Sequence, residues 1–119
     1  MVKKILIADD EVDLVEVVKM RLETNDYEVI TAYNGQETLD KMAEKPDLVI
    51  LDINMPQKDG FAVLKELKAN PATSSIPVIM FTSQSQLKAV ERAIAEGAND
   101  YITKPFNPKV LLDKIKKIL

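Results

Sequence analysis

The stretch Leu48–Gly60 reads LVILDINMPQKDG and joins the most apolar segment of the chain to an acid. The four apolar residues Leu48–Leu51 are followed directly by Asp52, and Pro56 comes four residues later. A run that is apolar at every position, rather than at alternate positions, is typical of a parallel strand buried on both faces. The stretch therefore predicts a central strand that delivers a carboxylate at its carboxyl end.

Four similar runs occur elsewhere in the chain, and segments with helical spacing separate them. These runs are Ile5–Ala8, Val29–Ala32, Val78–Phe81 and a weaker one at Tyr101–Thr103. Apolar residues spaced three or four apart predict a helix after each run. The apolar sets are Leu14, Val15, Val18 and Leu22; Leu39 and Met42; Phe61, Leu64 and Leu67; Leu87, Val90 and Ile94; and Leu111, Ile115, Ile118 and Leu119.

Cap and turn residues mark the borders of these helices. Asn107 before Pro108 predicts a capping residue and a first-turn proline, and Gly97 stands where the fourth helix should end. Gly35 after Asn34 is compatible with a hairpin, but a helical pattern follows, so we interpret it as a strand-to-helix turn. The alternation predicts an α/β fold: a doubly wound parallel sheet of five βα units in the strand order 2-1-3-4-5.

The composition limits both the chemistry and the partners of this chain. Its 119 residues are 46% hydrophobic and contain no linker, repeat or low-complexity segment, which predicts one domain over residues 1–119. The absence of Cys and His excludes disulfides, thiolate chemistry, His-containing triads and the usual zinc sites. A net charge of −3 and a last helix whose lysines have no interleaved aromatics argue against nucleic-acid binding. No run approaches the ~20 apolar residues of a membrane span, so we expect a soluble, cytoplasmic protein.

Polar side chains follow four of the five predicted strands. Asp9 and Asp10 follow the first strand, Asp52 the third, Thr82 the fourth and Lys104 the fifth. In a doubly wound sheet, ligands bind beyond the carboxyl ends of the strands, near the point where the strand order reverses. The first and third strands are neighbours at that point, so the three carboxylates should converge. Each acid taken alone can instead be a turn former, and Asp9 or Asp10 could cap the helix that begins near Glu11.

Convergence of three carboxylates favours a bound cation, because like charges repel and raise at least one pKa. Without His or Cys, the fitting ion is hard and oxygen-seeking: Mg²⁺, with Mn²⁺ as a substitute. An EF-hand does not fit, since Pro56 stands where a ligand is needed, and three scattered glycines form no phosphate-binding loop. Mg²⁺ beside Lys104 and the Thr82 hydroxyl predicts a phosphoryl site, in which Asp52 is a nucleophile that forms an aspartyl phosphate.

Four segments together resemble the receiver domain of two-component response regulators, including the single-domain chemotaxis type. They are ILIADDE (5–11), LVILDINMPQKDG (48–60), VIMFTS (78–83) and GANDYITKPF (97–106). The resemblance covers the whole chain and implies a flavodoxin-like (βα)5 three-layer sandwich. It also implies a signalling protein rather than an enzyme, which catalyses only its own phosphorylation and dephosphorylation.

The resemblance assigns roles to the acids and to the residues beside them. Asp52 would accept a phosphoryl group from a sensor histidine kinase, from a phosphotransfer protein or from a small donor such as acetyl phosphate. Asp9, Asp10 and Asp52 would hold Mg²⁺ together with the backbone carbonyl of Asn54. Asn54 and Gln84 occupy variable positions that tune the lifetime of the phosphoryl group in this family.

The resemblance also assigns roles to residues at the ends of the fourth and fifth strands. Thr82 and Lys104 would bind the phosphoryl oxygens, and a cis peptide bond between Lys104 and Pro105 would aim the lysine inward. Tyr101 would be the switch aromatic, whose swing accompanies a movement of Thr82 toward the phosphate. Without the motif, Tyr101 is a half-buried strand aromatic. Ser83 departs from the frequent Ala but is still small.

The output surface implied by the resemblance consists of residues 85–97, the strand Tyr101–Thr103 and the last helix, which would contact a downstream protein. Residues 85–97 carry a thin apolar stripe, so we expect this helix to pack weakly and to move. DNA-binding members with a symmetric receiver dimer carry Glu and Arg on the last helix, where this chain has Val110 and Lys114. We therefore expect a monomer or a weak dimer. Val110 can belong to a partner-binding patch or to the core.

Three functions stay open at this point. We favour a free-standing module that signals through protein contacts, without direct binding of nucleic acid or membrane, because no linker follows the last helix. The second is the receiver half of a longer DNA-binding regulator. The third is a Mg²⁺-dependent phosphatase or phosphotransferase for small substrates. It would need a substrate pocket and a separate acid–base group, and no unassigned residue suggests one.

Overall fold

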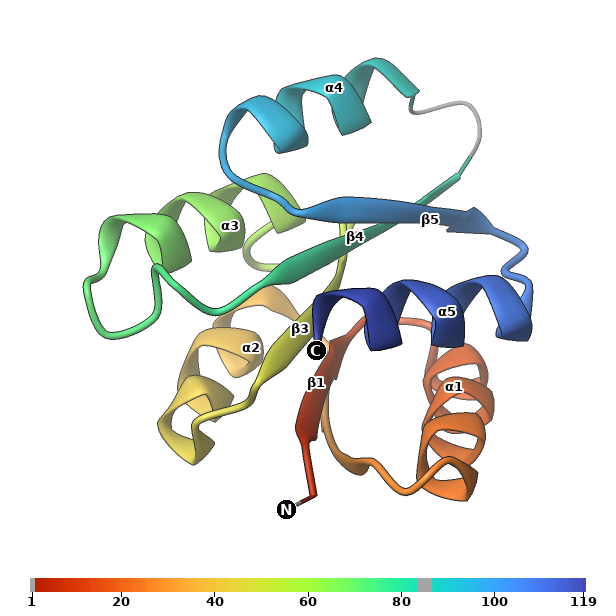
Figure 1. Cartoon of the computed structure of the whole chain (residues 1–119). Coiled ribbons are helices and arrows are strands. Elements are labelled where there is room, and N and C mark those ends of the chain that lie inside the picture. The colour runs from red at the N-terminus through yellow and green to blue at the C-terminus, as the bar shows by residue number, and fades with distance from the viewer. Residues whose placement is uncertain (1, 84–86) are drawn as a thin grey trace.

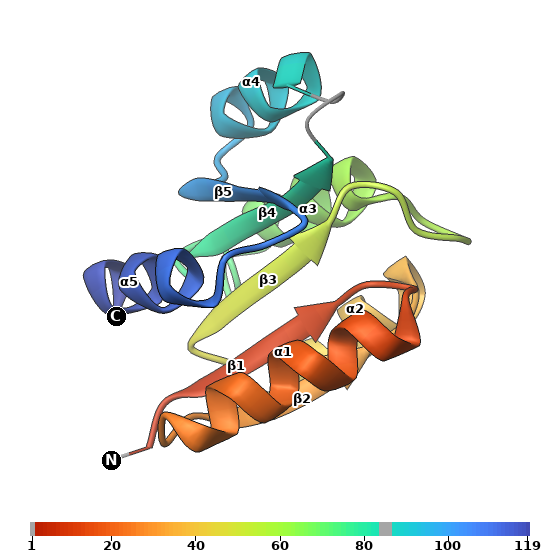
Figure 2. The same ribbon diagram turned by 90° about the vertical axis from the view of Figure 1, so that its right-hand side faces the viewer.

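The computed structural model describes residues 2–83 and 87–119. Its parallel strands are β1 (Lys4–Ala8), β2 (Glu28–Ala32), β3 (Leu48–Asp52), β4 (Val78–Ser83) and β5 (Asp100–Lys104). Its helices are α1 (Val12–Thr24), α2 (Gly35–Lys41), the short 3-10 helix η1 (Met42–Glu44), α3 (Gly60–Ala69), α4 (Leu87–Ala95) and α5 (Pro108–Ile118). The strands form one sheet in the order β2-β1-β3-β4-β5, which confirms the predicted α/β fold and topology. Figure 1 labels β1, β3, β4 and β5, and Figure 2 labels β2 as well.

Helices cover both faces of this sheet, which makes three layers. The buried residues of α1 and α5 pack on one face, and those of η1, α3 and α4 pack on the other. Figure 2 shows α1 lying along β1 and β2, on the side that faces the viewer. No helix within the described residues is long and apolar enough to cross a membrane.

The fully apolar strands divide their side chains between the two cores. In β3, Leu48 and Ile50 point into the core under α1 and α5, while Val49 and Leu51 point into the core under α3. All five residues of β3 are buried. Successive side chains of a strand point to opposite faces, so a strand covered on both faces needs apolar residues at every position. This is the physical reason for the run LVIL.

The predicted buried face of α1 is confirmed, since Val15, Val18 and Leu22 are fully buried. Elsewhere, two residues that were predicted to lie on buried helix faces are exposed. Ile94 of α4 is 43% exposed, whereas Val90 and Ala93 are buried, and Ile94 lies about 100° from Ala93 around the helix axis. Leu119 is exposed because it lies beyond the last residue of α5. The Leu87 side chain and Gln84 lie outside the described part of the chain.

Capping residues and glycines mark the borders of the helices. The side chain of Asn34 accepts a hydrogen bond from the Glu37 backbone N–H at 2.8 Å, so Asn34 and Gly35 form a strand-to-helix turn. Asn107 caps α5 in the same way, and Gly97 follows α4 with a φ of +113°, a conformation that suits glycine. A side chain at Gly60 would collide with the carbonyl oxygen of Asp52. Glycine there lets α3 begin directly against the end of β3.

Candidate functional site

The polar residues that follow the strands converge at the carboxyl edge of the sheet, as expected. Ala8 of β1 pairs with Leu51 of β3, so Asp9 and Asp52 come next to each other on adjacent strands. The edge surrounds a cavity of about 320 Å³. Its lining comprises Asp10, Glu11, Asp52, Asn54, Ser83 and Lys104.

The three acids form one cluster with unequal burial. Each of Asp9, Asp10 and Asp52 offers a carboxylate oxygen, and these oxygens lie within 4.8 Å of one another. Asp9 is fully buried, Asp52 is 4% exposed, and Asp10 is open to solvent. Asp52 is the last residue of β3 and Asp9 directly follows β1, whereas Asp10 lies one position further along the loop after β1.

One carboxylate oxygen of Asp9 stabilises a turn, and the other accepts no well-aligned hydrogen bond from the described residues. Its Oδ1 accepts a hydrogen bond from the backbone N–H of Glu11 at 2.9 Å, so the interpretation as a turn former is partly right. Its Oδ2 is buried without a well-aligned hydrogen bond from any described group, although the Nζ of Lys104 lies 2.8 Å away. A buried carboxylate oxygen in this situation is suited to ligate a cation.

The pKa values of the two buried acids indicate how unfavourable the cluster is without a cation. Burial raises the pKa of Asp52 to about 7, and the charge of Asp9 adds to the rise while Lys104 opposes it. Burial also raises the pKa of Asp9, against the lowering effects of Lys104 and of the Glu11 backbone. An all-oxygen donor set with one underused buried oxygen fits Mg²⁺ or Mn²⁺.

The ammonium of Lys104 lies among three carboxylates at this edge. Its Nζ lies 2.8 Å from Asp9 Oδ2, 2.9 Å from Glu11 Oε1 and 3.5 Å from Asp52 Oδ1. Burial opposes the charge of this amine, but its contacts with the carboxylates of Asp9 and Glu11, together with the charge of Asp52, outweigh burial and raise its pKa. The peptide bond from Lys104 to Pro105 is cis.

Glu11 is the one residue of this ion network that sequence reasoning missed. The sequence pattern places it only near the start of the first helix, whereas its side chain reaches Lys104 across 93 positions of the chain. Its place directly after the acidic pair in ILIADDE was the available signal.

The remaining predicted residues lie at different depths around the cavity. Thr82 is fully buried, and its hydroxyl donates a hydrogen bond to the Ser83 carbonyl at 3.2 Å. Asn54 is exposed in the loop after β3 and borders the cavity. Tyr101 is half-buried and lines two other cavities between β5 and the helices α4 and α5, outside the acidic one. Val110 is 45% exposed beside one of them, so the core role that the sequence left open is wrong.

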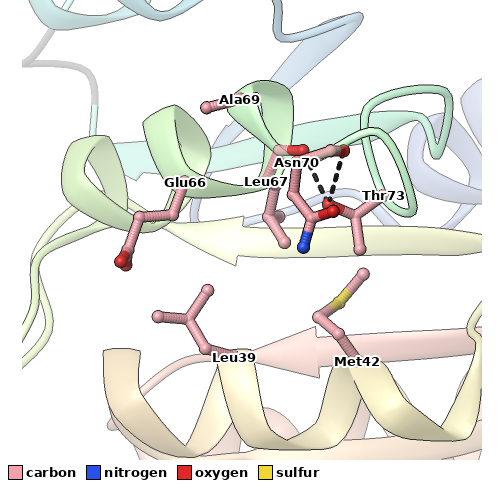
Figure 3. A pocket seen from close by; sticks show the side chains of 7 residues that line it. All are labelled: Leu39, Met42, Glu66, Leu67, Ala69, Asn70 and Thr73. Atoms are coloured by element: carbon pink, nitrogen blue, oxygen red, sulfur yellow. Dashed lines mark hydrogen bonds between the residues drawn. The ribbon is translucent and has the colours of Figure 1, made fainter.

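A separate cavity of about 400 Å³ lies between α2 and α3 (Figure 3), away from the acids. Leu39 and Met42 close it on one side, opposite Leu67. The hydroxyl of Thr73 at its end donates hydrogen bonds to the carbonyls of Leu67 and Asn70. None of the predicted site residues lines this cavity, so it takes no part in the candidate site.

Known sequences resemble this chain over almost its whole length. The family model of the response regulator receiver domain matches residues 5–116. The alkaline phosphatase synthesis transcriptional regulatory protein PhoP of Bacillus subtilis is 40% identical over 98% of this chain and 48% of its own length. The phosphate regulon transcriptional regulatory protein PhoB of Escherichia coli is 36% identical over 100% of this chain and 52% of its own length. The chain thus spans about half the length of these curated relatives.

Two solved structures, in contrast, match over nearly their whole length. A putative response regulator from Chloroflexus aurantiacus superimposes with a TM-score of 0.94 at 34% identity, covering 99% of this chain and 98% of its own. The chemotaxis response regulator CheY4 of Vibrio cholerae has a TM-score of 0.93 at 32% identity and covers 100% of both chains. Both similarities lie well above the level at which only the fold is shared.

Proposed function

This chain belongs to the family of response regulator receiver domains, and from that premise we propose that Asp52 is its phosphoacceptor. The observation that carries the proposal is the cluster of Asp9, Asp10 and Asp52 at one edge of the sheet, with Lys104 in contact with Asp9 and Asp52. In the proposal, residues 1–119 form one receiver domain that a phosphoryl group switches between two conformations. The domain promotes only its own phosphorylation and dephosphorylation.

Asp52 is the nucleophile of the proposed transfer. One of its carboxylate oxygens attacks the phosphorus of the donor and forms a new P–O bond. The bond from phosphorus to the leaving group breaks at the same time, and its electron pair goes to the leaving group: acetate for acetyl phosphate, or imidazole for a phosphohistidine of a histidine kinase or phosphotransfer protein. The product is an aspartyl phosphate.

Asp9, Asp10, Asp52 and the backbone carbonyl of Asn54 are the groups that would hold Mg²⁺. The ion would neutralise charge on the phosphoryl oxygens, and Mn²⁺ could replace it. The buried Oδ2 of Asp9 supports the assignment, because the described residues leave it without a well-aligned hydrogen bond. Exposed Asp10 would complete the set from the solvent side.

Lys104 and Thr82 bind the phosphoryl oxygens in this proposal. The ammonium of Lys104 is already 3.5 Å from Asp52 Oδ1, close enough to neutralise charge that develops on a group attached there. The hydroxyl of Thr82 can donate one hydrogen bond and lies on the next strand, where Asp52 pairs with Phe81, the residue before it. A move of Thr82 toward the phosphate would leave space for Tyr101 to swing inward.

The signal would leave through the face formed by α4, β5 and α5. Tyr101 lines a cavity of about 490 Å³ there, together with Val90, Glu91 and the exposed Ile94. Exposed Val110 borders a second cavity on the other side of Tyr101. Apolar side chains around the half-buried Tyr101 are suited to contact a downstream protein, which is the partner we propose.

A second candidate function is supported by the lengths of the relatives. PhoP of Bacillus subtilis is a transcriptional regulator of which this chain matches 48%, so the same switch would be the receiver part of a longer regulator. The match to CheY4 over 100% of both chains supports the free-standing form. The reading frame beyond Leu119 distinguishes the two, and Asp52 has the same role in both.

Intact mass spectrometry after incubation with acetyl phosphate and Mg²⁺ tests the proposal. We expect the mass of one phosphoryl group to be gained, stably in acid and labile in base, and the gain to disappear in Asp52→Asn. Asp113→Asn, an exposed substitution of the same kind on α5, should keep the full gain. No gain with any donor, or an equal gain in Asp52→Asn, would overturn the proposal.

A further inference from the structure

The ammonium of Lys104 is shared among three carboxylates, and the phosphoacceptor is the most distant of them. The two short contacts go to Asp9 and Glu11, at 2.8 and 2.9 Å, and Asp52 lies at 3.5 Å. The Lys104 side chain is only 18% exposed, so little water is available to replace these partners. A phosphoryl group on Asp52 must therefore draw the ammonium away from another carboxylate.

Glu11 is the partner that can be exchanged. Asp9 is fully buried and tied to the Glu11 backbone N–H, whereas the Glu11 side chain is 61% exposed. Glu11 is the N-cap residue of α1, but its side chain makes no capping hydrogen bond. Within residues 2–83 and 87–119, its carboxylate has no hydrogen-bond or ion-pair partner other than Lys104.

Glu11 also stands apart from the acids that would ligate a metal. The cluster of carboxylate oxygens within 4.8 Å of one another consists of Asp9, Asp10 and Asp52, and Glu11 is not a member. Yet Glu11 lines the same cavity through which a donor must reach Asp52. It is thus an anionic side chain at the opening of a site for anions, bound to the cation that those anions require.

We propose that Glu11 is a positioning residue that holds Lys104 in the resting state and competes with the phosphoryl group for it. The inference rests on the proposed phosphorylation of Asp52 and adds a means by which the chain sets its own loading rate. A donor must displace the Glu11 carboxylate from Lys104 before the ammonium can neutralise the transferred group. The released Glu11 side chain can turn into solvent, because it is exposed.

The size of the effect follows from the exposure of this ion pair. Pairs with one solvent-exposed member are weak, so the competition should slow loading roughly two- to five-fold rather than abolish it. The negative charge of Glu11 at the cavity opening also repels anionic donors, and salt screens this repulsion. Both effects grow with the charge of the donor.

The test compares Glu11→Gln with Glu16→Gln, which removes the same charge from an exposed position of the same helix. Phosphorylation rates are measured by intact mass over a range of acetyl phosphate concentrations with Mg²⁺, at low and high salt. We expect Glu11→Gln to reach half-maximal rate at a donor concentration roughly two- to five-fold lower at low salt, with a smaller difference at high salt. Glu16→Gln should follow the wild type.

Two further measurements separate competition from a general structural effect. Phosphoramidate carries less negative charge than acetyl phosphate near neutral pH, so the gain in Glu11→Gln should be smaller with it. Beryllofluoride, a mimic of the bound phosphoryl group, should bind Glu11→Gln more tightly by a similar factor, followed by NMR in the presence of Mg²⁺. A structural role would change neither the donor preference nor the salt dependence.

The outcomes distinguish this inference from the proposed function. If the wild type gains no phosphoryl group, the function of Asp52 fails. If the wild type is phosphorylated and Glu11→Gln loads at the same rate or more slowly, only the inference about Glu11 is overturned. Equal effects of Glu11→Gln and Glu16→Gln would also overturn it, since they would reduce the effect to net charge.

Discussion

The apolar residues of β1 and β3 stabilise the fold, whereas the acids at the carboxyl ends of the same strands destabilise it. Leu6, Val49 and Ile50 are fully buried in apolar surroundings. A few ångströms further along the same two strands, Asp9 and Asp52 are buried as well, and burial raises both of their pKa values. The comparison indicates that the strands act as a stable support for acids that are unfavourable where they lie.

The magnitudes explain how the fold tolerates this edge. Full burial of one Leu, Ile or Val side chain stabilises the folded state by about 1.5–3 kcal/mol. One pKa unit corresponds to about 1.4 kcal/mol, so a few well-packed strand residues offset the cost of an ionised Asp52. The apolar core must therefore stabilise the fold by more than the buried acids at this edge destabilise it.

The largest expected effect comes from a substitution in the apolar core of the strands. Ile50→Ala removes a fully buried side chain between the sheet and the helices α1 and α5, and should lower the free energy of unfolding by about 2–5 kcal/mol. Urea denaturation measures the change. Val17→Ala, at an exposed position of α1, should stay within about 0.5 kcal/mol. Similar losses in both variants would contradict the distinction between core and surface.

The second effect has the opposite sign and concerns the carboxyl edge. The folded-state pKa of Asp52 is about 7, above the ordinary value of 3.8, so the folded state keeps a proton that the unfolded chain has lost. Stability therefore falls as the pH rises from about 4 to about 7, and stays lowered above that range.

Asp52→Asn removes this cost and should stabilise the metal-free protein by up to about 4 kcal/mol near pH 8, with no gain below about pH 4. Urea denaturation at several pH values in the presence of a chelator measures it. Exposed Asp113→Asn should change the stability by less than about 0.5 kcal/mol at every pH. A stability difference for Asp52→Asn that does not vary with pH would refute the explanation by burial.

A third effect tests whether a bound cation offsets the unfavourable burial of the acids at the carboxyl edge. At ten times its dissociation constant, Mg²⁺ should raise the free energy of unfolding of the wild type by about 1.4 kcal/mol. Asp9→Asn should remove most of this increase, because it takes a charge from the cluster. Asp13→Asn, an exposed acid on α1, should keep it. Thermal unfolding with and without Mg²⁺ gives the comparison, and an increase that survives in Asp9→Asn would exclude Asp9 as a ligand.

The smallest effect concerns a second lysine, in a more open setting than Lys104. The Nζ of Lys114 donates hydrogen bonds to Asp100 and to the Tyr101 carbonyl, and lies 4.9 Å from the Tyr101 ring centroid. Lys114→Met should cost only about 0.5–1 kcal/mol, because these groups are partly exposed. Hydrogen exchange at Tyr101 should speed up accordingly. Lys116→Met, on the exposed side of α5, serves as the control and should leave that exchange unchanged.

The strands and most helix borders could be predicted because their signals are local. LVIL is apolar at every position, and Asn34 and Asn107 are capping residues next to helical patterns. The error at Ile94 has a tertiary cause. Apolar spacing identifies a helix, but the width of the surface it covers depends on the neighbouring strands, and α4 buries only the narrow stripe of Val90 and Ala93.

Glu11 illustrates the other limit of sequence reasoning. Asp9, Asp10, Asp52, Thr82 and Lys104 could be named because each directly follows a strand, and parallel strands end at one edge. Glu11 lies one position further on and contacts Lys104 only because the fold brings the start of α1 beside the end of β5. Its place after the acidic pair puts Glu11 near the edge, but no local pattern predicts its contact with Lys104 across 93 positions of the chain.

The sequence by itself determined the five βα units, their order and the edge at which the polar residues collect, because burial on both faces requires continuous apolar runs and parallel strands align their ends. The tertiary structure alone decided how deeply each acid is buried and which of them Lys104 pairs with. Charges interact according to distance and solvent access, and both of these arise from packing between residues far apart in the chain.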